Sequence, residues 1–297
     1  MANFTVSPGV KLNEIDNTFL TSQPVQAGAA IMGPTVKGPI LMPTIVTSYS
    51  EYTTMFGDVI ESGSQNYSYL TSIAAYNYFN YGGESLLVTR VASGSYTSAT
   101  SSVIEGGTVA NAFSLETISE GTLMNTGASG IGGALATGTK DNVRWEITTS
   151  NTSSGTFSLS IRRGDDITNK KTVLESFNNL SLDPNSNNYV AKVIGDQKLT
   201  YDSVNNQMVT TGEYSNSSRF VRIKSVNNPT LNYLDANGTP VTAFTGSIPT
   251  IGNGIFGSAT GAPFGVTAGK FYQNINAIDS QGLVGTNYDT AISLLSN

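Results

Sequence analysis

The stretch from Ala29 to Val91 follows the alternation of strands and helices that an α/β unit requires. Apolar runs at residues 29–32 and 86–91 have the length of buried strands, and glycines lie close to both of them. A shorter run at residues 45–46 lies between the two. The run 86–91 is apolar enough to be covered on both faces, which favours strands that share one sheet with helices packed against it.

Two helices are predicted between these strands. Ser48, with Glu51 three residues later, has the spacing of a capping box, and Gly57 is placed to end the first helix as a left-handed C-cap. A second helix, expected from about Gln65 to Gly82, carries one apolar stripe formed by Tyr69, Leu70, Ile73 and Tyr76. Such a stripe predicts burial. The side chains expected in this core are Leu70, Ile73, Leu86 and Val88.

The composition removes several classes of function. The 297 residues include no histidine and no cysteine, so the chain has no thiol nucleophile, no thiolate or imidazole metal ligand and no serine–histidine pair. A net charge of −6 argues against a nucleic acid partner, which would be bound by a basic surface. No apolar run approaches the roughly 18 residues of a membrane span. We therefore expect a protein that is not an enzyme and that binds no metal or cofactor.

Three local patterns imitate ligand-binding motifs, but each lacks an essential part. Residues 252–257 match GxGxxG, yet they have neither the preceding strand nor the following helix of a dinucleotide site. Asp183 starts an imitation of a calcium loop in which Ile194 replaces the bidentate glutamate. Residues 33–38 have P-loop spacing, with Pro39 in place of the phosphate-binding lysine.

After Val91 the sequence becomes rich in serine, threonine, glycine and alanine. Residues 92–140 are expected to form a boundary or a loose connector into an inserted β domain. Alternation at 143–148 and at 157–162 predicts an antiparallel pair with one face in water. Asp165-Asp166, next to two arginines, predicts a charged turn. The other elements expected here are strands at 172–177, 199–201 and 220–224, a short helix at 189–194 and a loop region at 235–269.

The first 20 residues mix apolar and polar positions and have no partner strand nearby in the sequence. Their apolar residues are spaced mostly by two, which suits a strand interrupted at Pro8-Gly9. Two interpretations are open: a frayed terminus, or an arm that adds a strand to a neighbouring subunit. The residues of such an intersubunit arm are Phe4, Val6, Pro8, Gly9, Val10, Leu12 and Ile15. The charged candidates for contacts between subunits are Lys11, Glu14, Asp16 and Lys37.

Several of these segments resemble motifs of contractile phage tail sheath proteins. The N-terminal matches are, in order, Ser7–Val10 with Glu14–Asp16 to SPGVYVxEID, residues 30–39 to AAFVGxxxKGP, residues 48–57 to SxxEFxxxFG, and residues 81–91 to NGGxxxxVVRV. Residues 175–184 resemble a fifth motif, ExFxNLSLDP. The four N-terminal motifs occur in the family's order and at its spacing. The resemblance favours the arm over the frayed terminus, because sheath subunits are linked by such arms.

The resemblance implies a β-rich α+β fold with an incomplete α/β ring-forming domain, an inserted β domain and an extended N-terminal arm. The implied domains are a linking arm at 1–20, the first half of the α/β sheath domain at 21–92, an outward-facing β-rich insertion at 93–275 and the start of the second half at 276–297. A helix expected at 290–295 reaches the last residues. We therefore expect the chain to be the N-terminal portion of a sheath protein.

The implied function is mechanical. Copies of the chain would form hexameric rings stacked helically around a tail tube, and contraction would drive that tube through the host envelope. The implied partners are further copies of the chain, the tail tube protein, and the baseplate and tail terminator proteins. The implied location is the tail sheath of the virion, assembled in the host cytoplasm. The sequence does not distinguish a phage tail from a bacteriocin or a secretion system.

An alternative function is a secreted or surface β-rich module that binds carbohydrate or a host receptor. It depends on the serine- and threonine-rich β part, which would present an aromatic platform. The residues of that platform would be Tyr96, Trp145, Tyr201 and Tyr214.

Overall fold

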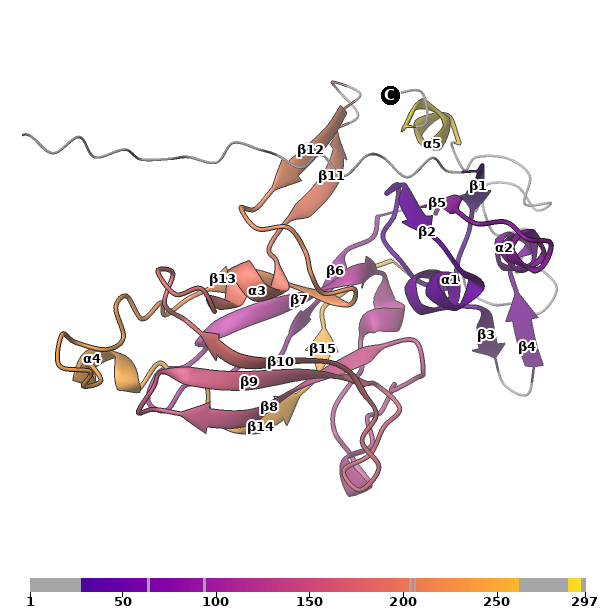
Figure 1. Cartoon of the computed structure of the whole chain (residues 1–297). Coiled ribbons are helices and arrows are strands. Elements are labelled where there is room, and N and C mark those ends of the chain that lie inside the picture. The colour runs from indigo at the N-terminus through magenta and orange to yellow at the C-terminus, as the bar shows by residue number, and fades with distance from the viewer. Residues whose placement is uncertain are drawn as a thin grey trace, which may run out of the picture.

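A computed structural model describes residues 28–62, 65–92, 95–202, 205, 207–261 and 288–294, and these form two units (Figure 1). The α/β unit comprises residues 28–92 and 288–294, and the β unit comprises residues 95–261. Strands outnumber helices in the described residues, and the predicted β-rich α+β fold is confirmed.

A three-stranded sheet forms the centre of the α/β unit. Its order is β1 (Ala29–Gly33), β5 (Leu86–Arg90) and β2 (Thr44–Val46). β1 runs parallel to β5, and β2 runs antiparallel to it. The apolar runs identified in the sequence therefore share one sheet, as predicted.

Two helices pack in this unit, joined by a hairpin. The helices are α1 (Tyr49–Phe56) and α2 (Leu70–Asn80), and the hairpin consists of β3 (Val59–Ser62) and β4 (Gln65–Ser68). The helix expected from Gln65 starts only at Leu70, because residues 65–68 pair with 59–62 instead. A short helix, α5 (Asp289–Leu294), lies at the same unit, at the top of Figure 1.

The predicted caps of α1 are present. The Ser48 hydroxyl accepts a hydrogen bond from the Glu51 N–H at 3.1 Å, which satisfies one of the free donors of the first turn. The Glu51 carboxylate reaches one residue further back than a capping box requires and accepts the Thr47 N–H at 2.8 Å. Gly57 ends the helix with a φ of 75°, which a side chain would make unfavourable.

Three of the four residues of the predicted stripe, Leu70, Ile73 and Tyr76, are exposed, and only Tyr69, just before α2, is buried. The prediction that Leu70 and Ile73 are buried is therefore wrong. Leu70 is 68% exposed and Ile73 is 46% exposed. The helix instead packs its small side chains inward, with Thr71 directly against Gly33 of β1, where an added Cβ would lie 2.4 Å from the Thr71 hydroxyl. Close approach of helix and strand favours these small residues. Leu86 and Val88 are buried, as predicted.

The β unit consists of two four-stranded antiparallel sheets. The first sheet has the order β10 (Val173–Ser181), β9 (Thr156–Arg163), β8 (Val143–Asn151) and β14 (Gly252–Gly254). The second has the order β13 (Val221–Val226), β7 (Phe113–Glu120), β6 (Ser98–Ser101) and β15 (Phe256–Gly257). Because β14 and β15 are almost consecutive in the chain, this segment joins the edges of the two sheets.

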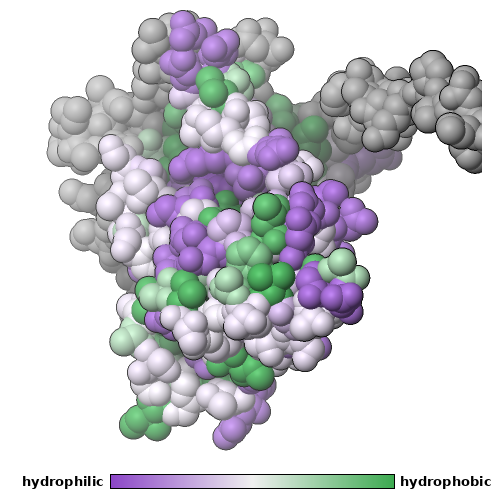
Figure 2. Space-filling view, turned by 90° about the vertical axis from the view of Figure 1, so that its left-hand side faces the viewer, coloured by the Kyte–Doolittle hydropathy of each residue, from purple (hydrophilic) through white to green (hydrophobic). Residues whose placement is uncertain are grey.

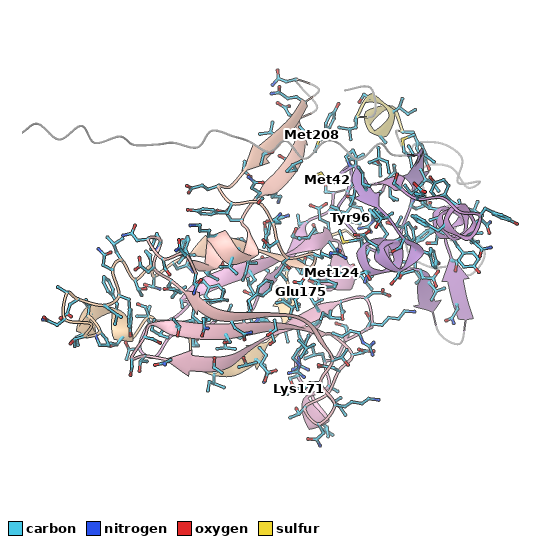
Figure 3. All side chains as sticks on the ribbon, viewed as in Figure 1. Met42, Tyr96, Met124, Lys171, Glu175 and Met208 are labelled. Atoms are coloured by element: carbon cyan, nitrogen blue, oxygen red, sulfur yellow. The ribbon has the colours of Figure 1, made fainter. Side chains whose placement is uncertain are left out.

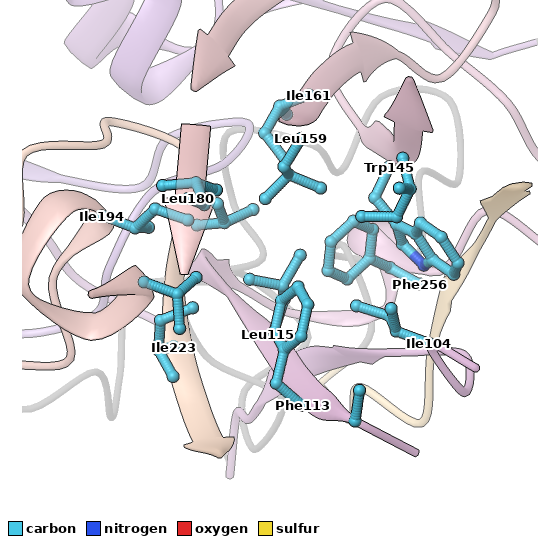
Figure 4. Close-up of a cluster of buried hydrophobic side chains, with 14 of the residues drawn as sticks. Ile104, Phe113, Leu115, Trp145, Leu159, Ile161, Leu180, Ile194, Ile223 and Phe256 are labelled. Carbon is cyan, nitrogen blue, oxygen red and sulfur yellow. The ribbon is translucent and has the colours of Figure 1, made fainter. Parts of the chain in front are cut away.

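The core of the β unit lies between its two sheets (Figure 4). Trp145, Leu159 and Leu180 come from the first sheet, and Leu115 and Phe256 come from the second; all of them are buried. Packing of two inner faces in this way gives the unit a core of its own. From the end of the β unit that carries α4 (Thr242–Thr245), hydrophobic residues form separate patches among neutral and hydrophilic ones (Figure 2).

Two expectations for the β unit need correction. Residues 92–140 are not a loose connector, because they contain β6 and β7 and the buried side chains of Ile104 and Phe113. The strand pair β8–β9 does not leave one face of β9 in water. Ser158, Ser160 and Arg162 on its second face are buried as well, and Arg162 is covered there by the turn that contains Asp166.

The remaining elements connect the two sheets. They are η1 (Thr122–Met124), η2 (Ile131–Gly133), α3 (Val190–Ile194), β11 (Lys198–Asp202) and β12 (Gln207–Thr211). The short helix expected at 189–194 corresponds to α3. β11 and β12 form a separate two-stranded ribbon that reaches toward α5 (Figure 1), where the Tyr201 and Ser293 hydroxyls are 3.3 Å apart.

Candidate functional site

The exposed side of helix α2 is the first candidate, because this surface helix carries no charged residue. Leu70, Ile73, Ala74 and Tyr76 lie on that side, and we call these four residues the α2 face. A helix at a protein surface normally places charged residues opposite its buried side. An uncharged, largely apolar face favours contact with another protein surface.

A hollow of 270 Å³ lies where the α2 face meets the end of β1. Its walls include Ile31, Met32, Pro34, Leu70, Ala74 and Tyr288. Among the described strands β1 pairs only with β5, so alternate N–H and C=O groups of β1 point away from any partner strand. Apolar walls next to an open strand edge can accept an extended apolar segment. They do not supply an acid–base pair.

A ladder of aromatic rings connects the α2 face to the core. The rings of Tyr76 and Tyr49 meet edge to face at 5.1 Å, Tyr49 stacks on Tyr52 at 5.8 Å, and Tyr52 packs on Phe56 at 5.5 Å. Burial, and then the hydrogen bond to Asp58, raise the pKa of Tyr49, and burial raises the pKa of Tyr52 to about 12. Both phenols are therefore neutral at physiological pH, and the ring contacts connect the α2 face to the buried core.

The second candidate is the contact between the two units, which centres on Arg90 at the end of β5. Its side chain is fully buried, and Nη1 donates to the Gly38 carbonyl oxygen at 2.6 Å and to the Glu120 carbonyl oxygen at 2.9 Å. The ring of Tyr96, labelled between the units in Figure 3, lies 5.5 Å from the guanidinium carbon. Burial lowers the pKa of Arg90, against the opposing effects of Tyr96 and other neighbours.

Glu120, Lys37 and Asp141 complete this contact. The Glu120 carboxylate accepts the N–H of Ile40 at 3.2 Å, and the Lys37 ammonium lies 3.2 Å from an Asp141 carboxylate oxygen. Burial raises the pKa of Glu120, against the hydrogen bond from Ile40, and burial lowers the pKa of Lys37, against the attraction of Asp141. We call the set of Lys37, Gly38, Arg90, Tyr96, Glu120 and Asp141 the joint. The hydrogen bonds and the ion pair of the joint connect the α/β unit to the β unit.

Of the residues predicted to contact neighbouring subunits, the structure describes only Lys37. Lys37, a candidate for a contact between subunits, pairs with Asp141 of its own chain. The other predicted contact residues lie outside the described residues, and they are Phe4, Val6, Pro8, Gly9, Val10, Lys11, Leu12, Glu14, Ile15 and Asp16.

Two of the sequence patterns that imitate ligand-binding motifs do not adopt the structure of those motifs. Residues 252–257 lie in β14 and β15 rather than in a turn before a helix. The Asp183 carboxylate accepts the N–H of Asn185 at 3.0 Å, as in a turn. Across the described ranges, no group of three or more acidic residues is placed to hold a metal ion. No helix in the same ranges is long and apolar enough to cross a membrane.

The aromatic platform of the alternative function is not formed by the residues named for it. Trp145 is buried in the core of the β unit, and Tyr96 lies in the joint. These two side chains therefore do not present a common exposed surface with Tyr201 and Tyr214.

Sequence reasoning missed Arg90 and Glu120 as interaction sites. One signal was available, because an arginine in a run predicted to be covered on both faces must find hydrogen-bond partners inside the protein. Its partners Gly38 and Glu120 are 52 and 30 residues away in the sequence. Nothing in the local pattern identifies them.

Several solved structures resemble parts of this chain. No family model matches the sequence, and no curated protein matches it. Among solved structures, a sheath tail protein from Desulfitobacterium hafniense matches with probability 1.00 at 12% identity and a TM-score of 0.28. A sheath tail protein from Listeria innocua matches with probability 1.00 at 9% identity and a TM-score of 0.30.

These alignments are partial. They cover 72% and 68% of this chain, and the chain spans 38% and 36% of the two solved proteins. Both solved proteins are sheath tail proteins, the family that the N-terminal motifs resemble. Because both TM-scores are low, these matches support no conclusion about function. The functional proposal therefore depends on the motifs and on the chain's own surfaces.

Proposed function

We propose that this chain is a structural subunit of a contractile tail sheath. One observation carries the proposal: the segments at 30–39, 48–57 and 81–91, which resemble sheath motifs, fold into a single α/β unit. That unit presents an uncharged helix face and an edge of β1 to which no strand of the described residues pairs. A subunit that polymerises needs such surfaces, because contacts between copies remove charge from the interface and bury apolar area.

The proposed assembly places this α/β unit in rings of six that stack helically around a tail tube. Contraction would rearrange these subunits and drive the tube through the host envelope. In this proposal the neighbours of the chain are other copies, the tube protein, and the baseplate and terminator proteins, all within the virion tail and assembled in the host cytoplasm. The proposed role is mechanical and requires no catalytic residue.

The β-rich insertion at 93–275 is proposed to face outward from this assembly. Its surface tolerates water, because hydrophobic residues form only separate patches on the end shown in Figure 2. The domain boundaries proposed from the sequence place half of an α/β domain at 21–92 and the start of its second half at 276–297. The position of α5 beside the hollow, through Tyr288, supports this arrangement.

The arm is proposed to link copies by strand addition. Phe4, Val6, Val10 and Leu12 alternate as a strand requires, and Pro8 cannot donate a ladder hydrogen bond, so pairing should be interrupted there. Fixing a residue costs about 1–2 kcal/mol of conformational entropy, which a partner strand would have to offset.

Deletion of residues 1–15 tests this link. We expect the melting temperature of the monomer to stay nearly unchanged, because an arm without a partner strand keeps its N–H and C=O groups in water at little cost. We expect tube assembly, observed by electron microscopy, to be lost or to give irregular tubes. Normal contractile tubes from the truncated protein would exclude the arm as the link between subunits.

A further inference from the structure

We propose that Arg90 acts as a pin that fixes the β unit at one angle on the α/β unit, so that the two units move as one body. The inference concerns the chain itself and stands whether or not the chain forms a sheath. The proposed function assigns no role to the side chain of Arg90.

The apolar contact between the units is small. Each unit has its own core, and the buried residues of the cluster that spans the boundary are Val36 and Tyr69, with Leu123 of the β unit packed against them. Hydrophobic burial stabilises an arrangement roughly in proportion to area and has no directional preference. The angle between the units must therefore be set mainly by the polar contacts of the joint.

Arg90 has the geometry of a pin. A single atom, Nη1, donates to the Gly38 carbonyl in the α/β unit and to the Glu120 carbonyl in the β unit. The Arg90 side chain is fully buried, so water could not readily replace Nη1 as the donor to these carbonyl oxygens. Gly38 has a φ of 109°, and a Cβ added there would lie 2.7 Å from the Phe56 ring, so this position requires glycine.

Further contacts act around the same pin. The Glu120 N–H donates to the Gly38 carbonyl at 3.3 Å, and the Glu120 carboxylate accepts the Ile40 N–H at 3.2 Å. The Lys37–Asp141 ion pair adds a largely buried contact between the units. A body attached through one exposed contact can rotate, whereas several buried contacts at different residues prevent rotation.

The absence of cysteine allows a direct test of this angle. Asn77→Cys in α2 and Ser153→Cys in the turn between β8 and β9 replace exposed residues, one in each unit, and take spin labels. Double electron–electron resonance then measures the distance distribution between the units. We expect one narrow distribution in the labelled parent protein. Arg90→Met in this background should widen it at least about twofold, because the units can then rotate.

Two controls make the result specific. Arg219→Met removes an exposed ion pair to Glu51 that also links the units, and it should leave the distribution unchanged. The only tryptophan, Trp145, lies in the core of the β unit, so an unchanged emission spectrum shows that this unit stays folded in each variant. Circular dichroism monitors the helices of the α/β unit.

The outcomes separate clearly. A folded Arg90→Met protein with the parent distribution overturns the proposal, and so does equal widening by Arg219→Met. If Arg90→Met does not fold, Arg90→Gln decides, since it keeps a side-chain donor at this position but removes the guanidinium that bridges the two carbonyls: widening supports the proposal, and the parent distribution overturns it. Because these measurements use the monomer, a failure of the proposed sheath function would appear separately as an absence of tubes.

Discussion

Leu70 and Leu86 give a matched pair of substitutions within the α/β unit. Leu86 is 2% exposed, so Leu86→Ala removes buried methyl groups and leaves a cavity, which should lower the free energy of unfolding by about 2–5 kcal/mol. Leu70 is 68% exposed. Since a fully buried leucine contributes about 1.5–3 kcal/mol, the third of Leu70 that is covered corresponds to about 0.5–1 kcal/mol. The higher helix propensity of alanine offsets a small part of that loss.

Urea unfolding followed by circular dichroism measures both changes in the isolated chain. We expect Leu86→Ala to shift the midpoint strongly and Leu70→Ala to shift it little. A loss in Leu70→Ala as large as that in Leu86→Ala would show that Leu70 is buried. The α2 face would then no longer be an open surface.

The same residue should matter in assembly. Leu70→Asp places a charge on the α2 face and should reduce tube formation, because an interface centre tolerates charge poorly. Asn77→Asp adds the same charge to an exposed position of α2 that is already polar, and serves as its control. Equal effects of the two substitutions would attribute the loss to net charge and not to the α2 face.

The remaining predictions concern stability. Asp166→Asn removes the carboxylate shared by two buried arginines and should cost about 3–5 kcal/mol in urea unfolding, whereas Asp165→Asn, in a partly exposed pair, should cost about 0–1 kcal/mol. Gly38→Ala should destabilise more than Gly82→Ala, since both glycines have positive φ but only Gly38 lacks room for a Cβ; equal midpoints would contradict this. Burial alone would raise the pKa of Glu51, but hydrogen bonds from the preceding turn outweigh it and hold the pKa below its usual value. Its stabilising effect is therefore present above the unfolded pKa and is lost as the pH falls through the folded pKa, so Glu51→Gln should flatten the acid limb of a stability–pH curve.

Local patterns in the sequence predicted the local elements of the fold. The capping residues of α1, the strands at 29–33 and 86–90, and the β8–β9 pair follow from short-range spacing. The side of α2 that faces the core could not be predicted from these patterns, because hydrophobicity alone assigned Leu70 and Ile73 to the core. Close packing against Gly33 selected small side chains instead, and that requirement comes from a residue far away in the sequence.

The candidate site was less predictable than the fold. Arg90 is visible in the sequence as a charge in an apolar strand, but its partners are fixed only when the β unit folds. In the same way, Asp165 and Asp166 look equivalent in the sequence. Asp166 is buried with Arg162, while Asp165 stays at the surface, because the turn points the two carboxylates in different directions.

Electron microscopy of the purified protein, examined over a range of concentrations, tests the central claim most directly. The proposed sheath function predicts rings or tubes of uniform diameter that become more abundant with concentration, and that are lost in the Leu70→Asp variant. Dispersed single particles at every concentration, for a protein shown by circular dichroism to be folded, would contradict the claim.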